Sequence, residues 1–262
     1  MVSLSNHRPE PVEGRVRGYA IHASTGSART ACFQCPYNYG LISKCQPIVF
    51  YYWMVRVGRQ CHVKNWMEMA LKFDKKRWNE RFKEKKFALG KKANPFLRKH
   101  IDLLPKGKAL DLAAGEGRNA VFLACHGFEV VAVDISEAGL SKARKLAKEM
   151  NVRIQTILAD LDTYPIKKED YDLIGNFYFL DRGLIPKIKR GLKKGGRVIF
   201  ETYLLEQRDL GTKGPRNPKY FLKHNELLKL FKELRVLYYR EGIFTENGRK
   251  KAVASLIAEK TY

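Results

Sequence analysis

The chain has 262 residues and a formal net charge of +23, from 50 Lys and Arg against 27 Asp and Glu. Hydrophobic residues make up 45% of the sequence, enough to bury a sizeable core, which excludes a mainly disordered chain. No apolar run approaches the roughly 18 residues of a membrane-spanning helix. Five cysteines give no disulfide framework at this length, so the sequence favours a reducing cytoplasm. The basic charge indicates nucleic acid or anionic substrates as partners, against the alternative of a Lys-rich solvated surface.

Residues 1–66 differ in composition from the rest, with scattered Pro, Gly and Ser and no sustained helical or strand periodicity. We expect an irregular or disordered extension here, followed by one folded domain over residues 67–262. The runs HRPEPVEG (7–14) and STGSART (24–30) resemble translations of a short palindromic repeat found between bacterial genes. That resemblance implies a start assigned too far upstream, with the biological start at Met54, Met67 or Met69.

One metal-like pattern lies in the same extension, Cys32-x-x-Cys35 with Cys45, Cys61 and His62 beyond it. Structural zinc sites use two ligand pairs at tight spacing, because each pair closes a short turn around the ion. The second pair is missing here, since Cys45 stands alone and Cys61 and His62 are neighbours in sequence. The sequence therefore predicts no metal site.

From residue 72 onward, apolar residues recur at helical and strand spacing. A charged helix is expected over Lys72–Lys86, and Pro95 opens a second one, since proline is favoured in a first turn. Past Gly107, strands and helices alternate, which indicates a doubly wound, mostly parallel α/β sheet. Asn247-Gly248 then joins the last two strands as an antiparallel hairpin. The predicted strands cover residues 109–112, 130–133, 152–158, 171–174, 197–203, 234–240 and 251–258, and the later helices cover 118–126, 136–150, 182–192 and 227–231.

The loop after the first strand of this alternation has the composition of a nucleotide-binding turn. GEGRNA (115–120) fits the pattern G-x-G-x-x-A between a strand and a helix. Glycines there permit a tight turn and let a ligand approach the backbone at a helix N-terminus. Asp134 ends the next strand, where a carboxylate can accept hydrogen bonds from both ribose hydroxyls. These features predict either a dinucleotide or S-adenosylmethionine as the ligand.

Charge separates the two ligands. Asp111 closes the first strand and Glu116 lies inside the loop, so two carboxylates are expected to face the place of a pyrophosphate, where like charge is costly. S-adenosylmethionine offers an ammonium and a sulfonium instead, and its carboxylate can use the N–H groups of the loop. Asp160 and Leu161, at the end of the third strand, suit the amino group and ring of its adenine. The residues therefore favour S-adenosylmethionine.

Residues 74–260 resemble a class I S-adenosylmethionine-dependent methyltransferase. The segments that carry the resemblance are ALDLAAGEGRNAVFLA (109–124), VVAVDIS (130–136), ILADLD (157–162), YDLIGNFYF (171–179) and GGRVIFETY (195–203). The closing hairpin also matches the seven-stranded sheet of that family. The chain is similar to the small prokaryotic branch around tellurite-resistance methyltransferases, in which segments like RWNERF (77–82) and GPRNP (214–218) occur. Ala113 stands where the family has its first glycine, and we expect this to be tolerated because its Cβ need only avoid the methionine arm of the cofactor.

The resemblance implies a set of cofactor-contacting residues at the strand ends. They are Asp111, Ala113, Gly115 and Gly117 around the methionine portion, Asp134 and Ile135 at the ribose and adenine, Asp160 and Leu161 at the adenine edge, and Asn176 and Phe177 beside the reacting methyl group.

Four side chains near the expected methyl position are candidates to face the substrate: Tyr178, Arg182, Tyr203 and Arg216. None is an obvious general base, and methyl transfer from a sulfonium needs one only when the nucleophile carries a proton. We therefore expect a small-molecule acceptor with a soft or anionic nucleophile. The identity of the acceptor and the oligomeric state are left open by the sequence.

An RNA methyltransferase is the alternative, because residues 182–197 hold seven basic residues and no acid. Against it, the fourth strand ends in NFYF (176–179), without the proline pair typical of amino-directed nucleic-acid enzymes. Cys125 is expected on a buried helix face rather than where a cytosine-methylating enzyme needs its nucleophile. A non-catalytic basic binding domain is the third interpretation, but the acids that the site chemistry requires are present.

Overall fold

The structure, a computed structural model, describes residues 74–262 except 212, 213, 216 and 247. The predicted extension over residues 1–66, with its cysteine pattern and its start positions, lies outside the described residues. Arg216, a predicted substrate-facing residue, also lies outside them. These assignments therefore stay predictions.

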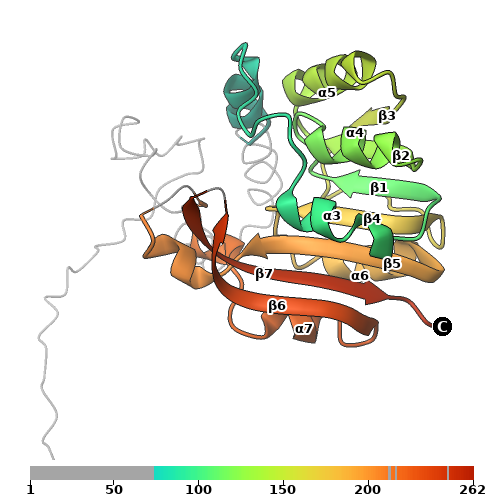
Figure 1. Cartoon of the computed structure of the whole chain (residues 1–262), viewed down its shortest axis with the longest axis vertical. Coiled ribbons are helices and arrows are strands. Elements are labelled where there is room, and N and C mark those ends of the chain that lie inside the picture. The colour runs from blue at the N-terminus through green and yellow to red at the C-terminus, as the bar shows by residue number, and fades with distance from the viewer. Residues whose placement is uncertain (1–73, 212–213, 216, 247) are drawn as a thin grey trace, which may run out of the picture. The chain divides into compact units, whose positions relative to one another are not determined.

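Seven strands form one sheet in the order β3-β2-β1-β4-β5-β7-β6 (Figure 1). β1 to β5 run parallel, and β7 is antiparallel to both β5 and β6. The last two strands form the predicted hairpin, since the pairing of Glu246 with Arg249 leaves two residues between them. The predicted α/β sheet with its antiparallel close is confirmed. Its strands are β1 (Lys108–Leu112), β2 (Glu129–Asp134), β3 (Gln155–Leu158), β4 (Tyr171–Phe177), β5 (Leu192–Tyr203), β6 (Arg235–Glu246) and β7 (Arg249–Glu259).

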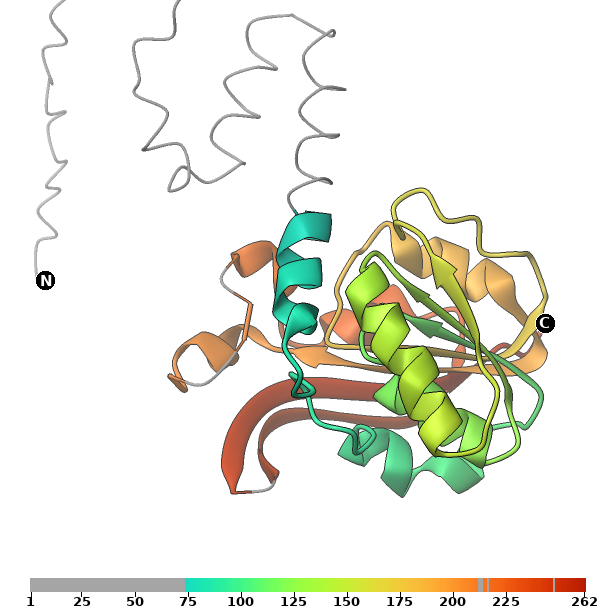
Figure 2. The same cartoon turned by 90° about the horizontal axis from the view of Figure 1, so that it is seen from above.

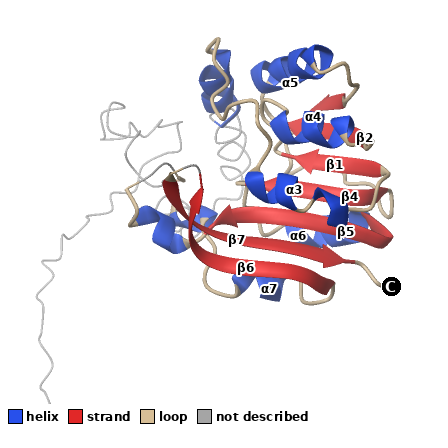
Figure 3. Ribbon diagram, viewed as in Figure 1, coloured by secondary structure: helices blue, strands red, loops and turns tan. Residues whose placement is uncertain are grey.

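Helices cover both faces of this sheet (Figures 2 and 3). They are α3 (Pro95–Lys99), α4 (Arg118–Cys125), α5 (Glu137–Glu149), α6 (Leu184–Gly191) and α7 (Glu226–Leu230), and residues 74–83 are helical as well. Leu110 and Leu112 of β1 pack with Ile188 of α6 and with the residues of α7, whereas Ala109 packs with α3 and α4 on the other face. Because neighbouring strand residues point to opposite faces, the central strands read as continuous apolar runs.

The first half of β5 differs from the prediction. The sequence predicts a turn at Gly195-Gly196 and a strand from Arg197, but the strand begins at Leu192, directly after α6. The Gly195 N–H donates to the Lys260 carbonyl at 2.7 Å, and the Lys260 N–H donates to the Gly196 carbonyl at 2.9 Å. These bonds hold the glycine pair inside the sheet, where the register between β4 and β5 shifts as it does at a bulge.

The bounds of β3 and α3 and the exposure of Cys125 also differ from the prediction. β3 begins at Gln155, because Val152 packs against α4 and α5 instead of extending the strand. The helix that Pro95 opens ends at Lys99, and a short 3-10 turn follows it. Cys125, the last residue of α4, is exposed, so its expected place on a buried helix face was wrong.

Helices α4 and α5 approach each other closely at Gly117. This residue precedes α4 with a left-handed φ of +78°. A Cβ at Gly117 would lie 2.4 Å from the Cβ of Ala143 and 2.8 Å from its Cα, which is too close for any side chain. The absence of a side chain therefore lets α5 lie against the loop that follows β1, where the strand-end acids described below are found.

We predict that Gly117→Ala lowers the free energy of unfolding more than Gly195→Ala does. Both glycines are left-handed, at φ +78° and +77°, so each substitution brings about 1–2 kcal/mol of backbone strain. Only at Gly117 does the added methyl group also collide with a neighbouring helix, a further cost of about 1–3 kcal/mol, since a Cβ at Gly195 has nothing within 4 Å. Denaturant unfolding of both variants measures the difference. Equal losses would contradict a close contact between α4 and α5.

Candidate functional site

The carboxyl ends of four neighbouring strands meet at one edge of the sheet. The register pairs Leu112 of β1 with Val133 of β2 and with Asn176 of β4. Asp134 follows Val133, and the end of β3 lies beside it, which brings Asp160 to the same edge. In parallel α/β sheets this is the edge where ligands bind. The fold thus brings together strand-end residues that are far apart in the sequence.

The loop after β1 turns through a series of left-handed residues. Ala113, Gly115 and Gly117 have φ values of +53°, +55° and +78°. The N–H of Ala114 donates to the Val133 carbonyl at 3.0 Å and ties the loop to β2. An alanine in this conformation costs about 1–2 kcal/mol relative to its ordinary backbone. The glycine that the resemblance places at residue 113 therefore has a backbone role, in addition to the space that it leaves for a ligand.

Asp111, at the end of β1, is a buried carboxylate with one oxygen that accepts no hydrogen bond from the described residues. Its side chain is 1% exposed, and its Oδ2 atom has no hydrogen-bond partner among the described residues. Burial, and secondly the charge of Asp134, raise its pKa to about 7, against the opposing effects of Arg118 and of the Ala120 N–H. A cationic group beside this carboxylate would favour the ionised form. The end of β1 therefore suits an ammonium group of a ligand.

Asp134, at the end of β2, is buried but bonded to the backbone. Its Oδ2 accepts from the Gly115 N–H at 2.7 Å and its Oδ1 from the Ser136 N–H at 2.8 Å. Burial raises the pKa of Asp134, and these two N–H groups oppose that shift. The cap of α5 is Ser136, whose Oγ accepts from the Gly139 N–H. Asp134 is thus not needed as the helix cap. The Ile135 N–H also acts on its carboxylate, and the lone pairs that remain can accept from a ligand hydroxyl.

Two more unpartnered oxygens lie at this edge. Among the described residues, the buried side-chain atoms that lack a hydrogen-bond partner are Asp111 Oδ2, Asp160 Oδ2 and Asn176 Oδ1. Each such atom costs about 1–3 kcal/mol unless a donor reaches it. Leu161 and Phe177, which follow β3 and end β4, are buried and apolar. The edge therefore combines acceptors with apolar walls, as a site for a nucleoside-like ligand requires.

Residues 74–83 lie against this edge, and from the sequence we expect the segment Trp78–Leu89 to fold over the pocket. The Asn79 Oδ1 accepts from the Ser136 Oγ at 2.8 Å and from the Ala138 N–H at 3.1 Å, at the start of α5. The ring of Phe82 is 3% exposed, and it would lie 3.3 Å from a Cβ built on Gly115. The helix thus packs on both the β1 loop and α5. Sequence periodicity shows only that Phe82 lies on the apolar face of a basic helix.

Glu116 has a different role from the one predicted. Its carboxylate, in a residue only 3% exposed, pairs with the Lys142 ammonium at 2.8 Å and accepts from the Leu89 N–H at 3.3 Å. Lys142 also donates to the Lys86 carbonyl at 2.9 Å. Glu116 therefore fastens the segment before α3 to α5 and does not face the place of a pyrophosphate. Electrostatic opposition to a pyrophosphate at this edge then comes from Asp111.

The predicted substrate-facing residues divide into two groups. Tyr178 and Tyr203 follow or end β4 and β5, and their rings stack with centroids 4.8 Å apart. Arg182 donates to both carboxylate oxygens of Glu226, at 2.6 and 3.1 Å, and to two backbone carbonyls. These bonds hold the segment before α7 in place. The guanidinium of Arg182 is therefore engaged by this loop and does not stand ready for a substrate. Arg216 lies outside the described residues.

This strand order, the left-handed loop after β1 and the acids at the ends of β1, β2 and β3 match the fold and the strand-end residues that the resemblance to class I S-adenosylmethionine-dependent methyltransferases implies. Residues 109–196 match the family model described as a methyltransferase domain. The match covers this segment of the chain alone, and the relatives that the chain resembles are S-adenosylmethionine-dependent methyltransferases.

The chain is similar to the probable S-adenosyl-L-methionine-dependent methyltransferase TehB of Haemophilus influenzae, with 30% identity over 166 residues that cover 58% of this chain and 57% of the relative. The crystal structure of TehB from Haemophilus influenzae matches with a TM-score of 0.55 at 23% identity, covering 64% of this chain and 62% of that one. Geranyl diphosphate C-methyltransferase from Streptomyces coelicolor A3(2), solved with S-adenosyl-L-homocysteine, matches with a TM-score of 0.50 at 17% identity, covering 63% and 79%. The chain thus spans less than two thirds of the TehB length, and the two structures show the fold alone. The predicted similarity to the branch of TehB is confirmed.

The described residues offer neither a metal site nor a membrane-spanning helix. No group of three or more His, Cys, Asp and Glu side chains in residues 74–262, apart from the positions not described, is arranged to hold a metal ion. No helix in the same part of the chain is long and apolar enough to cross a membrane. The three unpartnered oxygens therefore remain the feature that indicates a ligand, and their acceptor chemistry fits the ammonium and amino groups of S-adenosylmethionine.

We predict that the affinity for S-adenosylmethionine weakens as the pH falls below 7. Asp111 is protonated below its pKa of about 7 in the free protein, whereas the ammonium of the ligand favours the carboxylate. Binding then releases a proton, and the Kd rises roughly tenfold for each unit by which the pH falls from 7 to 5. Asp111→Asn binds more weakly at pH 8 and loses this dependence. Calorimetry over the pH range measures both proteins, and a flat profile for the unsubstituted protein would refute the role of Asp111.

We also predict that Asp134→Ala weakens cofactor binding by tens of fold. The substitution removes the acceptor for the ribose, and hydrogen bonds to a charged group contribute about 1.5–3 kcal/mol each. It also leaves the Gly115 and Ser136 N–H groups without their bonds, so the Kd is measured at a temperature where the variant is folded. Glu137→Ala is the matched control, because it removes an exposed acid three residues further on. Unchanged affinity in Asp134→Ala would place the ribose elsewhere.

Proposed function

We propose that the protein transfers a methyl group from S-adenosylmethionine to a small-molecule acceptor with a soft or anionic nucleophile. The observation that carries the proposal is the row of buried, unpartnered oxygens of Asp111, Asp160 and Asn176 at the strand ends. When bound, the cofactor supplies a methyl group on a sulfonium, which is electrophilic and leaves a neutral thioether behind. We also propose that the protein is located in the cytoplasm, in line with its low cysteine content.

The residues of the edge would bind and orient the cofactor. Asp111 would pair with its ammonium, and Asp134 would accept from its ribose hydroxyls. Ile135 and Leu161 would enclose the adenine, while Phe177 would border the reacting carbon. Since the leaving group is good, alignment of the reactants is the main task, and it contributes about 7–11 kcal/mol in well-oriented reactions. A nucleophile that is already deprotonated attacks without a general base.

The segment before α3 supports a small acceptor. Asn79 and Phe82 pack on the loop after β1 and on the start of α5, and the pair of Glu116 with Lys142 fastens the segment that follows. A cover of this kind excludes water from a reacting methyl group and limits the size of what can reach it. A folded RNA would have to displace these contacts.

The basic residues of the α6 region also count against RNA. Of the seven that the sequence places in residues 182–197, five are engaged within the protein. They are Arg182 with Glu226, Lys187 with the carbonyls of Leu161 and Asp162, Lys189 with Glu233, Lys193 with Asp172, and Arg197 with Glu259. Phosphate groups would have to compete with these partners. The basic side chains of this region therefore mainly form contacts within the protein, and few of them are left to form a nucleic-acid-binding surface.

The proposal predicts the fraction in which a labelled methyl group appears. The protein and S-adenosylmethionine labelled in its methyl group are added to a cell extract, and the products are separated into small molecules, protein and RNA. We expect label in the small-molecule fraction, and less of it with Asp134→Ala when the cofactor concentration lies below the Kd of that variant. Transfer to a small acceptor should change little between 50 and 200 mM salt, whereas phosphate-driven RNA binding falls by roughly 10³ or more. Label confined to RNA, with that salt dependence, would refute the proposal.

A further inference from the structure

Arg118, the first residue of α4, follows the loop after β1 and is only partly exposed. Its Nη1 donates to the Leu89 carbonyl at 3.1 Å, and its guanidinium makes no other hydrogen bond to the described residues. The Leu89 N–H is bonded to Glu116, so the segment before α3 does not depend on Arg118 alone. A guanidinium has more N–H donors than this one bond uses. Most of its donors can therefore serve a ligand.

The position of Arg118 is unfavourable for the helix that it begins. The N-terminus of an α-helix is positive, so an acid is favoured there and a cation is not. The first turn of α4 nevertheless holds no acid, and its N-cap residue, Gly117, has no side chain to cap it. A cation at such a helix start strengthens a positive potential that already attracts anions. The backbone and the side chain would together stabilise an anionic group at this place.

Asp111 is an independent sign that a ligand belongs at this helix start. The Ala120 N–H, in the first turn of α4, acts on the Asp111 carboxylate, and so does the charge of Arg118. The side chain of Asp111 is 1% exposed, and its Oδ2 has no hydrogen-bond partner among the described residues. A buried carboxylate that lacks a donor thus lies within electrostatic range of a guanidinium that lacks an acceptor.

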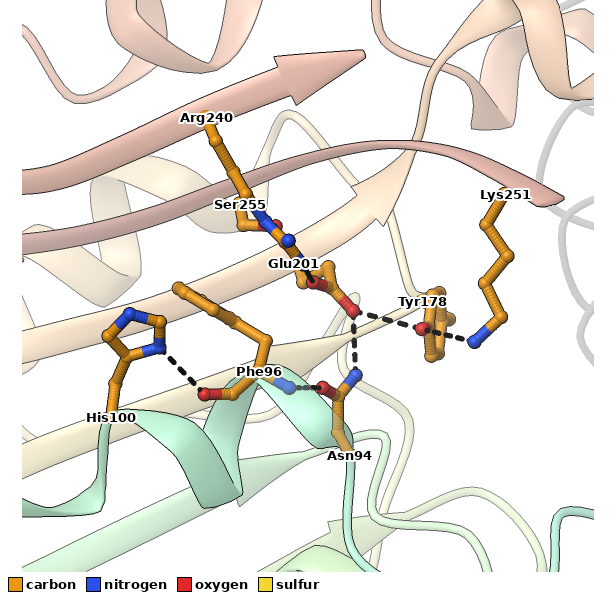
Figure 4. A network of polar contacts seen from close by, with 8 residues as sticks. All are labelled: Asn94, Phe96, His100, Tyr178, Glu201, Arg240, Lys251 and Ser255. Atoms are coloured by element: carbon orange, nitrogen blue, oxygen red, sulfur yellow. Dashed lines mark hydrogen bonds and ion pairs between the residues drawn. The ribbon is translucent and has the colours of Figure 1, made fainter. Parts of the chain in front are cut away.

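The start of α4 is held in place by contacts with distant parts of the chain. Asn119, its second residue, is 7% exposed, and its Oδ1 accepts from the Asn94 N–H at 2.9 Å. The Asn94 Nδ2 in turn donates to the buried Glu201 of β5 at 2.8 Å (Figure 4). Gly117 lies against Ala143 of α5. A helix start that is already fixed has little freedom to lose when it binds an ion, which favours a specific site.

We propose that Arg118 and the N-terminus of α4 bind the carboxylate of the amino-acid arm of S-adenosylmethionine. The inference rests on the proposed function, of which it specifies one binding residue. The ammonium and the carboxylate of that arm are attached to one carbon atom, and Asp111 and Arg118 offer the opposite charges at one helix start. A guanidinium can meet a carboxylate with two parallel N–H donors, which gives the attraction a direction.

The site would thus recognise a zwitterion and not merely a cation. A ligand that keeps the ammonium but lacks the carboxylate can still pair with Asp111. It leaves the guanidinium of Arg118 without an anion, and its own ammonium is then repelled by that charge. The arrangement therefore selects against cofactor analogues that have lost the carboxylate.

The test compares S-adenosyl-L-homocysteine with its decarboxylated analogue, which keeps the ammonium, the thioether and the nucleoside. Each ligand is titrated by calorimetry into the full chain at pH 8, above the pKa of about 7 of Asp111. We expect the unsubstituted protein to bind S-adenosyl-L-homocysteine at least tenfold more tightly than the analogue. Arg118→Met should weaken S-adenosyl-L-homocysteine at least tenfold and should not weaken the analogue. Arg98→Met, which removes the same charge from an exposed position on α3, should change neither Kd.

Arg118→Gln separates the charge of Arg118 from its bond to Leu89. Glutamine keeps N–H donors for the Leu89 carbonyl but has no charge, so this variant should also lose the preference for the carboxylate, and it remains informative if Arg118→Met fails to fold. Equal binding of the two ligands by the unsubstituted protein, or an equal loss of both in the variants, overturns the inference. Absence of any binding of S-adenosyl-L-homocysteine would instead refute the proposed function, so the two failures are distinct.

Discussion

The cost of burying carboxylates at the ends of parallel strands governs this molecule. Asp111 and Asp134 lie at the ends of adjacent strands and are almost fully buried. An ionised carboxylate in such a place raises the free energy of the folded protein unless hydrogen bonds or an opposite charge compensate it. For Asp134 the backbone provides the offset, through N–H groups on both sides of the site. For Asp111 the protein leaves one oxygen without a partner. The left-handed loop, the start of α5 and the preference for a cationic ligand all follow from how these two charges are accommodated.

The same edge is divided between two kinds of polar group. On the side of β1, β2 and β3, acceptors lack partners, and the site is complete only with a ligand that donates. On the side of β5 and β7, the buried Glu201 accepts hydrogen bonds from Asn94, Tyr178 and Ser255, which lie within the protein (Figure 4). β4 lies between the halves and contributes Asn176 to one and leads into Tyr178 of the other.

The fold could be predicted because its determinants are local. Apolar runs, helical spacing and the Asn247-Gly248 turn each depend on a few neighbouring residues, and the strand-end acids follow from the ends of those runs. The parts that could not be predicted depend on pairs distant in sequence. The Gly195-Gly196 pair stays inside β5 because Lys260 bonds to it from the C-terminus. Glu116 turns away from the ligand because Lys142 and Leu89 lie beside it, and no spacing rule contains that information.

Ala113, after β1, has the left-handed conformation of this loop without being the glycine that the sequence motif specifies. Residue 113 turns at φ +53°, a conformation that glycine adopts without strain and alanine adopts at a cost. The surrounding bonds of Ala114 and Gly115 to β2 and Asp134 are strong enough to impose it. A search that demands glycine at this position would overlook the chain, although the loop has the required shape. In this loop the requirement is therefore for a backbone torsion angle rather than for one residue type, and the acids that flank the turn, Asp111 and Asp134, are a second sign of the site.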